Sequence, residues 1–220
     1  STTQNPTNII AGTYSVVLTD ANGCVTSNSI TLTQPNTLVA AASSPTVNGA
    51  YNITCYGNNN GTINLNVNGG TSAFTYAWTG TGAYTGSSQN PSGLVAGTYQ
   101  VLVTDVNNCT ATTSITLSQP TLLTSSVSSP TFIGNNNISC NGLLDGAINL
   151  SVNGGTSAYS YAWTGPSTFT SNTQNPTGLQ AGVYQITTTD ANGCVTSTSI
   201  TLTEPAAMSV NVNSPTLAGG

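Results

Sequence analysis

The sequence predicts an all-β chain of antiparallel β-sandwich domains arranged in tandem. Two observations carry this prediction. Apolar residues alternate with Thr, Ser and Asn over short stretches, which is the pattern of half-buried strands. The chain also repeats itself at a fixed interval, and turn-forming Gly, Asn and Pro residues separate the short stretches. Helical periodicity is not found, so no helix is expected.

The repeat is visible in short motifs. Ala-Gly-Thr-Tyr at 11–14 returns at 96–99 and, as Ala-Gly-Val-Tyr, at 181–184. Tyr-Ala-Trp-Thr-Gly at 76–80 returns at 161–165. Each offset is 85 residues, which is too long for solenoid units of about 20–50 residues and suits a small domain with its own core.

Domain boundaries are expected at Pro35, Pro120 and Pro205, which end the successive units. The chain begins and ends inside a unit, so we expect a piece of a longer protein, with any export signal outside it. The expected parts are the C-terminal part of one domain, two complete domains and the start of another, at 1–35, 36–120, 121–205 and 206–220.

Within 36–120 the alternation predicts an immunoglobulin-like sandwich of short strands. Strands are expected near Leu38, at Ile53–Cys55, through Ile63–Val67, Phe74–Trp78, Tyr99–Val103 and Ala111–Leu117, with one or two more in 82–95. The segment Leu94–Tyr99 resembles the tyrosine corner of such sandwiches. Structural roles are therefore expected for the corner tyrosines and for one core tryptophan per complete unit, namely Tyr14, Tyr99, Tyr184, Trp78 and Trp163.

The charge inventory excludes whole classes of function. The chain has no Lys, Arg or His, and its acidic residues are Asp20, Asp105, Asp145, Asp190 and Glu204. Nucleic-acid binding and attachment to anionic lipid both need cations, so neither partner is expected. No apolar run approaches the ~18–20 residues that span a bilayer, so no membrane insertion is expected. Acid–base chemistry lacks His, and no cofactor or enzymatic activity is expected.

Asp20, Asp105 and Asp190 stand at equivalent turns, where two readings compete. Calcium needs about six to eight oxygen ligands with several carboxylates, but each unit holds at most three acids in all. An Asp that caps its own turn is therefore the favoured interpretation. The same scarcity argues against a glycosidase with paired carboxylates.

The five cysteines suggest disulfides, because a zinc site lacks four ligands within any one unit. Two pairings respect the period. One joins Cys55 to Cys109 and Cys140 to Cys194; the other joins Cys24 to Cys55 and Cys109 to Cys140. The strand after Cys109 carries the chain roughly 26 Å away, at ~3.3 Å per residue, whereas a disulfide needs Cα atoms about 4.4–6.8 Å apart. We therefore favour the first pairing, within each unit.

The motifs together resemble the SprB repeat of giant surface adhesins from gliding bacteria. The matching elements are a Cys-x-Gly opening, a Gly-Gly turn, an aromatic strand ending in Trp, Ala-Gly-x-Tyr, Thr-Asp-x-x-x-Cys and a closing Pro, found here at 140–142, 154–155, 161–163, 181–184, 189–194 and 205. The resemblance implies export by the type IX system, display on the bacterial cell surface, and a part in adhesion or gliding.

The leading functional hypothesis is a passive stalk segment that holds an adhesive surface away from the cell and contacts neighbouring repeats of its own chain. One alternative is a polysaccharide-binding module, with Tyr84 and Phe169 as the aromatic contacts. Another is a self-assembling filament subunit that pairs with copies of itself, because the strands lack the charged residues that discourage edge pairing.

Overall fold

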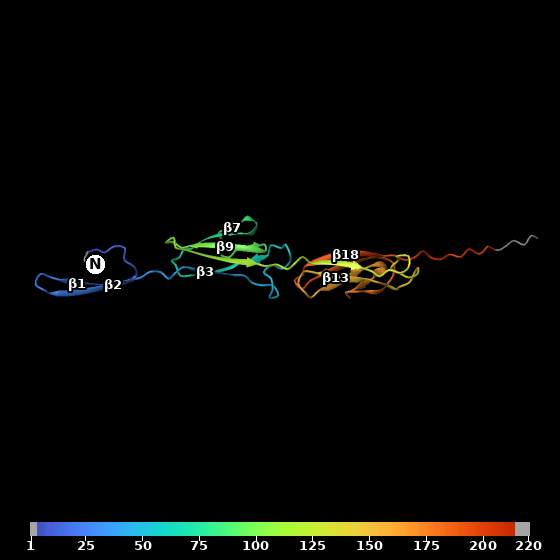
Figure 1. The fold of residues 1–220 in the computed structure, drawn as a ribbon, viewed down its shortest axis with the longest axis horizontal. Helices are drawn as coiled ribbons and strands as arrows, with labels where there is room; N and C mark the ends of the chain where they lie inside the picture. The colour runs from blue at the N-terminus through green and yellow to red at the C-terminus, as the bar shows by residue number, and fades with distance from the viewer. Residues whose placement is uncertain (1–3, 214–220) are drawn as a thin grey trace, which may run out of the picture. The chain divides into compact units, whose positions relative to one another are not determined.

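The computed structural model describes residues 4–213 of the chain, and these residues form antiparallel β-sheets (Figure 1). The predicted class, tandem immunoglobulin-like β-sandwiches, is confirmed. The contacts divide the chain into two compact units. Unit 1 holds the residues up to Ser43 together with Ile63–Pro91 and Thr98–Ile115, and unit 2 holds Ser44–Thr62, Ser92–Gly97 and the residues from Thr116 onward.

Unit 2 contains a sandwich built from residues 124–202. One sheet has four strands in the order β15 (Thr170–Ser171), β14 (Ser160–Thr164), β17 (Gly182–Thr189) and β18 (Val195–Leu202). The opposing layer is made of two strand pairs, β11 (Thr124–Ser128) with β13 (Asn149–Asn153) and β12 (Gly146–Ala147) with β16 (Thr177–Leu179). A short 3₁₀ turn, η2 (Pro166–Thr168), follows β14, and the pair β4 (Gly61–Thr62) and β8 (Ser92–Leu94) also belongs to this unit.

The core of this sandwich draws residues from both layers. Alternate residues of each strand point inward, as the two-residue period of a strand requires. In β17, for example, Tyr184 and Ile186 are each 1 % exposed, whereas Val183 is 55 % exposed. The buried cluster comprises Ile138, Ile148, Leu150, Trp163, Leu179, Tyr184, Ile186 and Leu202. One continuous core therefore joins the two layers of this repeat.

Unit 1 repeats the four-stranded sheet. Its order is β10 (Thr110–Leu117), β9 (Gly97–Thr104), β6 (Thr75–Gly80) and β7 (Tyr84–Gly86), with η1 (Thr81–Ala83) between β6 and β7. A second layer pairs β3 (Val39–Ser43) with β5 (Asn64–Asn68). The N-terminal hairpin joins β1 (Gly12–Thr19) to β2 (Val25–Leu32) in the register that β17 and β18 also adopt.

The hairpin β1–β2 exposes residues whose counterparts are buried elsewhere. Val16 and Leu18 are 63 % and 66 % exposed, but Val101 and Val103, at the equivalent positions of β9, are fully buried. In 36–120 other strands of the repeat cover these positions, and residues 4–35 contain no counterpart of those strands. The hairpin therefore exposes an apolar face that other strands cover in 36–120.

The Gly-Gly turn fixes where the chain enters each repeat. Gly69 and Gly70 have φ of +73° and +63°, a region that favours glycine. A Cβ on Gly69 would lie 2.1 Å from the carbonyl oxygen of Thr37, so no other residue fits this close approach. In the same way, a Cβ on Gly154 would lie 2.0 Å from the carbonyl oxygen of Leu122. The turn is therefore packed directly onto the first residues of its own repeat.

The predicted strands form with one exception. The strand expected at Ile53–Cys55 is wrong, because these residues form bends that lead into a turn at 56–57. The short strands expected within 82–95 are β7 and β8. The exception arises because the amides of Asn52 and Ile53 both donate to the carbonyl oxygen of Ser118, at 3.0 and 3.1 Å, which bends the chain away from a strand ladder.

The aspartates cap their own turns, as expected. Oδ1 of Asp190 accepts hydrogen bonds from the amides of Asn192 and Cys194, at 2.9 and 2.8 Å, and Oδ2 accepts one from Thr156, at 2.8 Å. Asp105 holds the equivalent turn of unit 1 through the amides of Asn107, Cys109 and Thr71. These bonds, that of Thr71 first, hold the pKa of Asp105 below its ordinary value against the opposing effect of burial.

We predict that Thr188→Val stabilises its repeat. Thr188 is fully buried in β17, and its hydroxyl has no hydrogen-bond partner among the described residues. Val103 occupies the equivalent position of β9. Removing an unsatisfied buried hydroxyl is expected to raise the free energy of unfolding by about 1 kcal/mol.

Urea unfolding measured by Trp163 fluorescence, in a Trp78→Phe background, gives this free energy. Thr201→Val, on an exposed position of β18, is the matched control and is expected to change little. A lower free energy of unfolding in Thr188→Val than in the wild type would contradict the prediction.

We predict that Asp105→Asn destabilises its repeat at neutral pH and flattens its pH dependence in acid. A carboxyl whose pKa is lowered by folding stabilises the fold above its unfolded pKa of about 4, and this contribution disappears as the pH falls through the folded pKa. An amide in its place does not titrate and cannot accept the Thr71 bond at Oδ2.

The measurement is urea unfolding at pH 7 and pH 3, followed by Trp78 fluorescence in a Trp163→Phe background. Asp20→Asn is the control, because Asp20 accepts the same two local amide bonds while the counterpart of Thr71 would precede residue 1. An unchanged difference in stability between the two pH values in Asp105→Asn would refute the role given to this carboxylate.

Candidate functional site

The feature that best defines a site is a disulfide between Cys55 and Cys194, whose Cα atoms are 5.7 Å apart. Both residues belong to unit 2, but they come from different repeats of the sequence. Cys24, Cys109 and Cys140 are free and exposed. The favoured pairing of Cys55 with Cys109 and Cys140 with Cys194 is therefore wrong, and so is the alternative of Cys24 with Cys55 and Cys109 with Cys140.

The strand β10 explains why the predicted pairing fails. The Cys55 loop is held at the C-terminal end of β10, where the amide of Gly57 also donates to Oε1 of Gln119, at 2.8 Å. Cys109 precedes the first residue of the same strand. Eight residues at ~3.3 Å each separate the two cysteines by roughly 26 Å. The length of one strand therefore excludes a disulfide within the repeat.

The path of the chain explains why Cys55 bonds to the turn of the following repeat. The turn 190–194 lies beside the first residues of its own repeat: Gly155 donates to the carbonyl oxygen of Thr121, at 2.9 Å, and Ala191 donates to that of Thr156, at 3.1 Å. Thr121 follows Gln119 after a single proline. The Cys55 loop and the Cys194 turn therefore meet at the same joint.

Amide side chains reinforce the disulfide. Nδ2 of Asn192 donates to the carbonyl oxygen of Thr54, at 3.0 Å, and to Oγ1 of Thr156, at 2.9 Å. Nδ2 of Asn48 donates to Oδ1 of Asn192. Residues on both sides of the disulfide thus share one hydrogen-bond network, which makes the joint a specific contact.

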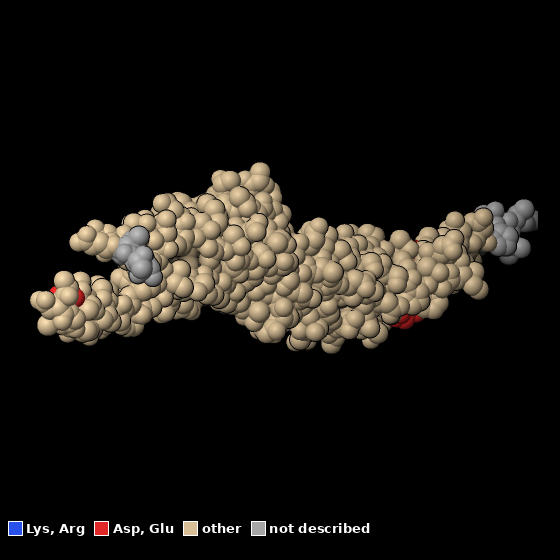
Figure 2. All heavy atoms as spheres, turned by 60° about the vertical axis from the view of Figure 1, so that its left-hand side comes forward, with Lys and Arg blue, Asp and Glu red and all other residues tan. Residues whose placement is uncertain are grey.

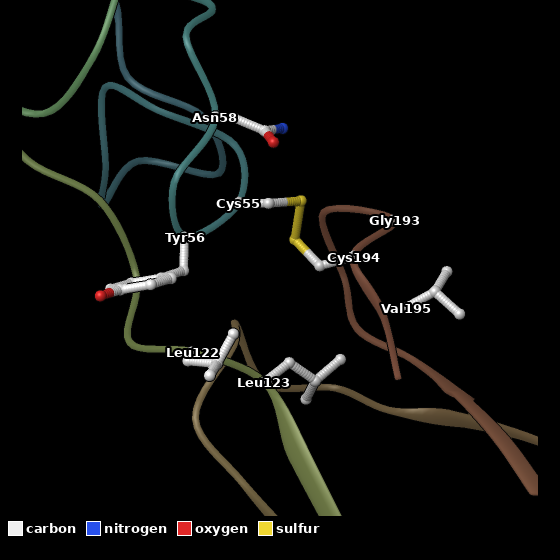
Figure 3. Close-up of a pocket in the computed structure, with 8 residues that line it drawn as sticks. All are labelled: Cys55, Tyr56, Asn58, Leu122, Leu123, Gly193, Cys194 and Val195. Atoms are coloured by element: carbon white, nitrogen blue, oxygen red, sulfur yellow. A yellow bond between two sulfur atoms is a disulfide. The ribbon is translucent and has the colours of Figure 1, made fainter. Parts of the chain in front are cut away.

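A pocket of about 290 Å³ borders the disulfide (Figure 3). Its lining residues are Cys55, Tyr56, Asn58, Leu122, Leu123, Gly193, Cys194 and Val195. No titratable side chain other than Tyr56 faces it, because both cysteines are oxidised. The pocket therefore offers no nucleophile with an adjacent base, and its chemistry suits packing.

The described residues hold no cluster of three or more His, Cys, Asp and Glu side chains that could bind a metal. Within them, no helix has the length and apolar character needed to cross a bilayer. Figure 2 shows a surface made almost entirely of uncharged residues, with acidic atoms at a few places.

Four of the five structural residues expected from the sequence, Trp78, Trp163, Tyr99 and Tyr184, are buried. Trp78 and Trp163 are each 1 % exposed, and their indole N–H groups donate to the carbonyl oxygens of Ser88 and Thr173, both at 2.9 Å. The hydroxyl of Tyr184 donates to the carbonyl oxygen of Gln180, four residues upstream, at 3.0 Å.

The other two corner tyrosines each show one of these features. Tyr14 donates to the carbonyl oxygen of Ile10 at 2.8 Å, which is the bond of a tyrosine corner. Tyr99 is 1 % exposed. Burial raises the pKa of Tyr184, so its hydroxyl stays protonated as a donor.

Tyr84 and Phe169, suggested as ligand contacts, pack on their own domains. The ring of Tyr84 meets Tyr99 edge to face at 5.5 Å, and that of Phe169 meets Tyr184 at 5.3 Å. Both are half-buried. Contact with a ligand stays a prediction for these two residues.

Sequence reasoning missed Thr54, Gln119 and Asn192, which hold the joint together. The period contained a signal for the cysteine pairing that brings these residues together. The separation of Cys55 from Cys194 equals one full period added to the separation of Cys140 from Cys194. That pairing respects the repeat as well as the two predicted pairings do, and it joins a cysteine to the far turn of the next repeat.

Comparison with solved structures finds similarity to parts of several other proteins. The structure of a 1.5-MDa bacterial ice-binding adhesin, described for host cell surface retention, is 17 % identical, covers 90 % of this chain and 74 % of its own, and has a TM-score of 0.47. The N-terminal eight Ig domains of Down Syndrome Cell Adhesion Molecule isoform 1.30.30 are 16 % identical, with coverage of 86 % and 26 % and a TM-score of 0.34. A tetra-tandem repeat from the extending region of a large adhesion protein is 13 % identical, with coverage of 90 % and 58 % and a TM-score of 0.31.

Curated protein sequences give no match to this chain. The family model of the SprB repeat, in contrast, matches residues 50–83 and 136–168. Each matched segment includes the Cys-x-Gly loop, the Gly-Gly turn and the aromatic strand of one complete unit. The resemblance drawn from the sequence is thus confirmed: two segments of this chain match the SprB repeat.

Proposed function

We propose that this chain is a load-bearing stalk segment of a large bacterial cell-surface adhesin. Its repeats space an adhesive surface from the cell and take part in surface attachment or gliding. The domains are 36–120 and 121–205, flanked by parts of neighbouring domains at 1–35 and 206–220. The observation that carries the proposal is the disulfide that joins residues of two successive repeats.

Two further features support this function. A disulfide persists outside the reducing cytosol, which suits display on the cell surface after export by the type IX system, as the SprB family implies. The candidate joint has packing residues and amide bonds in place of catalytic groups, so we infer a role without catalysis. The partners proposed first are neighbouring repeats of the same chain.

The mechanism is a limit on extension under load. When the chain is pulled from its ends, force passes through the Cys55–Cys194 bond and bypasses the residues between them. These residues keep their hydrogen-bonded sheets, because they are shielded from the load. The disulfide thus replaces the unfolding of most of two sandwiches by the strength of one covalent bond.

Single-molecule pulling of the full chain from its two ends tests this mechanism. The two cysteines of the disulfide are 139 residues apart in the sequence. Reducing the bond is therefore expected to add about 500 Å to the contour length that unfolding releases, at ~3.6 Å per residue. The variant Cys55→Ser is expected to give the longer length without reductant. Cys24→Ser is the matched control, because Cys24 is free, and it is expected to behave as the wild type.

Equal contour lengths in oxidised and reduced protein would overturn the load-bearing role. The rival functions give different results. A polysaccharide-binding module would bind on a glycan array and lose binding in Tyr84→Ala and Phe169→Ala, whereas we expect no binding. A filament subunit would gain mass with concentration in analytical ultracentrifugation, whereas we expect a constant mass.

A further inference from the structure

We propose that Cys109 and Cys140 are the halves of two more joints of the same kind. Cys109 receives the Cys-x-Gly loop of a preceding repeat, and Cys140 enters the Thr-Asp-x-x-x-Cys turn of a following repeat. Successive repeats are then linked in an unbroken covalent series. This inference rests on the proposed stalk of tandem repeats and extends it from one observed disulfide to a rule for the array.

The pocket beside Cys109 is the counterpart of the pocket beside Cys194. It measures about 310 Å³ and is lined by Gln34, Pro35, Asn36, Thr37, Leu38, Gly70, Cys109 and Thr110. The shift of one period that carries Tyr184 onto Tyr99 also carries Leu122, Leu123, Cys194 and Val195 onto Thr37, Leu38, Cys109 and Thr110. In the pocket of Cys194, the Cys55 loop forms the remaining wall (Figure 3). A loop of this type is therefore the occupant that the Cys109 pocket fits.

The turn that carries Cys109 is built like the turn that carries Cys194. The amide of Cys109 donates to Oδ1 of Asp105 at 2.8 Å, and that of Cys194 donates to Oδ1 of Asp190 at 2.8 Å. Nδ2 of Asn107 donates to Oγ1 of Thr71 at 3.0 Å, matching the bond of Asn192 to Thr156. The thiol of Cys109 is thus held in the backbone setting that forms a disulfide one repeat later.

The loop that carries Cys140 is likewise held as the Cys55 loop is. Asn137 and Ile138 donate to the carbonyl oxygen of Thr203, at 2.9 and 3.0 Å, as Asn52 and Ile53 do to that of Ser118. The amide of Gly142 donates to Oε2 of Glu204 at 2.7 Å, where Gly57 uses Gln119. Across this loop the amide of Ser139 donates to Oδ1 of Asp145. Across the Cys55 loop the amide of Thr54 donates to Oδ1 of Asn60 in the same way. Its geometry is therefore preset for the next turn.

The spacing accounts for every free cysteine. Partners of Cys24 and Cys109 would lie 139 residues upstream, and the partner of Cys140 would lie 139 residues downstream. All three positions fall outside residues 1–220. The rule observed for Cys55 and Cys194 thus explains why the other three cysteines are free in this chain.

Formation of each joint is a two-electron oxidation. The thiols of the two cysteines lose two protons and two electrons as the S–S bond forms, and a small disulfide oxidant takes them up as its own S–S bond breaks to give two thiols. In a fully linked array, a covalent path that enters the chain at Cys109 leaves it at Cys140 and crosses the next disulfide. The segment of chain between these two cysteines is shorter than the full period, which runs from Cys109 to Cys194.

The experiment uses the full chain, lengthened by a second copy of residues 121–205 inserted after Pro205, so that the added copy follows a proline as Thr121 follows Pro120. The protein is oxidised in a glutathione redox buffer, alkylated and digested with pepsin without reduction. Mass mapping is expected to find Cys55 linked to Cys194, and Cys140 linked to the cysteine of the added copy that corresponds to Cys194. Cys109 is expected to be alkylated.

Two controls sharpen the result. The original chain, treated in the same way, is expected to show Cys140 alkylated. In the lengthened chain, Cys140→Ser is expected to leave the added copy's counterpart of Cys194 as a free thiol. Alkylated Cys140 in the lengthened chain, or Cys140 linked to Cys109 or Cys194, would overturn the inference. Alkylated Cys140, or Cys140 linked to Cys109, leaves the proposed function standing, because neither outcome affects the Cys55–Cys194 bond on which the pulling experiment depends. Cys140 linked to Cys194 would contradict the proposed function as well, and it is recognised by alkylation of Cys55.

Discussion

The length of one strand governs the arrangement of this protein. β10 and β18 each run for eight residues, with a cysteine turn before the first residue and a cysteine loop anchored beyond the last. The two cysteines of a repeat are therefore held at opposite ends of a rigid ladder and cannot meet. A disulfide partner for either cysteine must therefore lie in another repeat, and the joint between successive repeats brings Cys55 and Cys194 together.

The joint depends on interactions that need no positively charged side chain. Backbone amides donate to the carboxylates of Asp105 and Asp190, glycines allow the turn at 69–70 and its counterpart to pack on the chain, and the side-chain amide of Asn192 donates to the carbonyl oxygen of Thr54. Such bonds are short-ranged and strongly dependent on geometry. A surface without Lys or Arg therefore does not prevent specific contacts between repeats.

In the proposed stalk, the disulfide gives a local contact a mechanical role. Hydrogen bonds alone would let each sandwich unravel separately under load, and the released length would be that of the whole repeat. A bond between repeats instead places residues of both inside one covalent loop. In this way a chain of small domains, each with a modest core, can resist extension beyond what the individual cores supply.

The sequence by itself determined the all-β class, the period that separates Tyr14, Tyr99 and Tyr184, the buried tryptophans, the tyrosine corners and the turn-capping aspartates. These features follow from local alternation and turn chemistry, which act within a few residues. The tertiary structure alone decided that Ile53–Cys55 bends away from a strand and that Cys55 bonds Cys194. Both depend on where the end of β10 lies relative to the next turn, and a distance between residues 139 apart leaves no mark on local pattern.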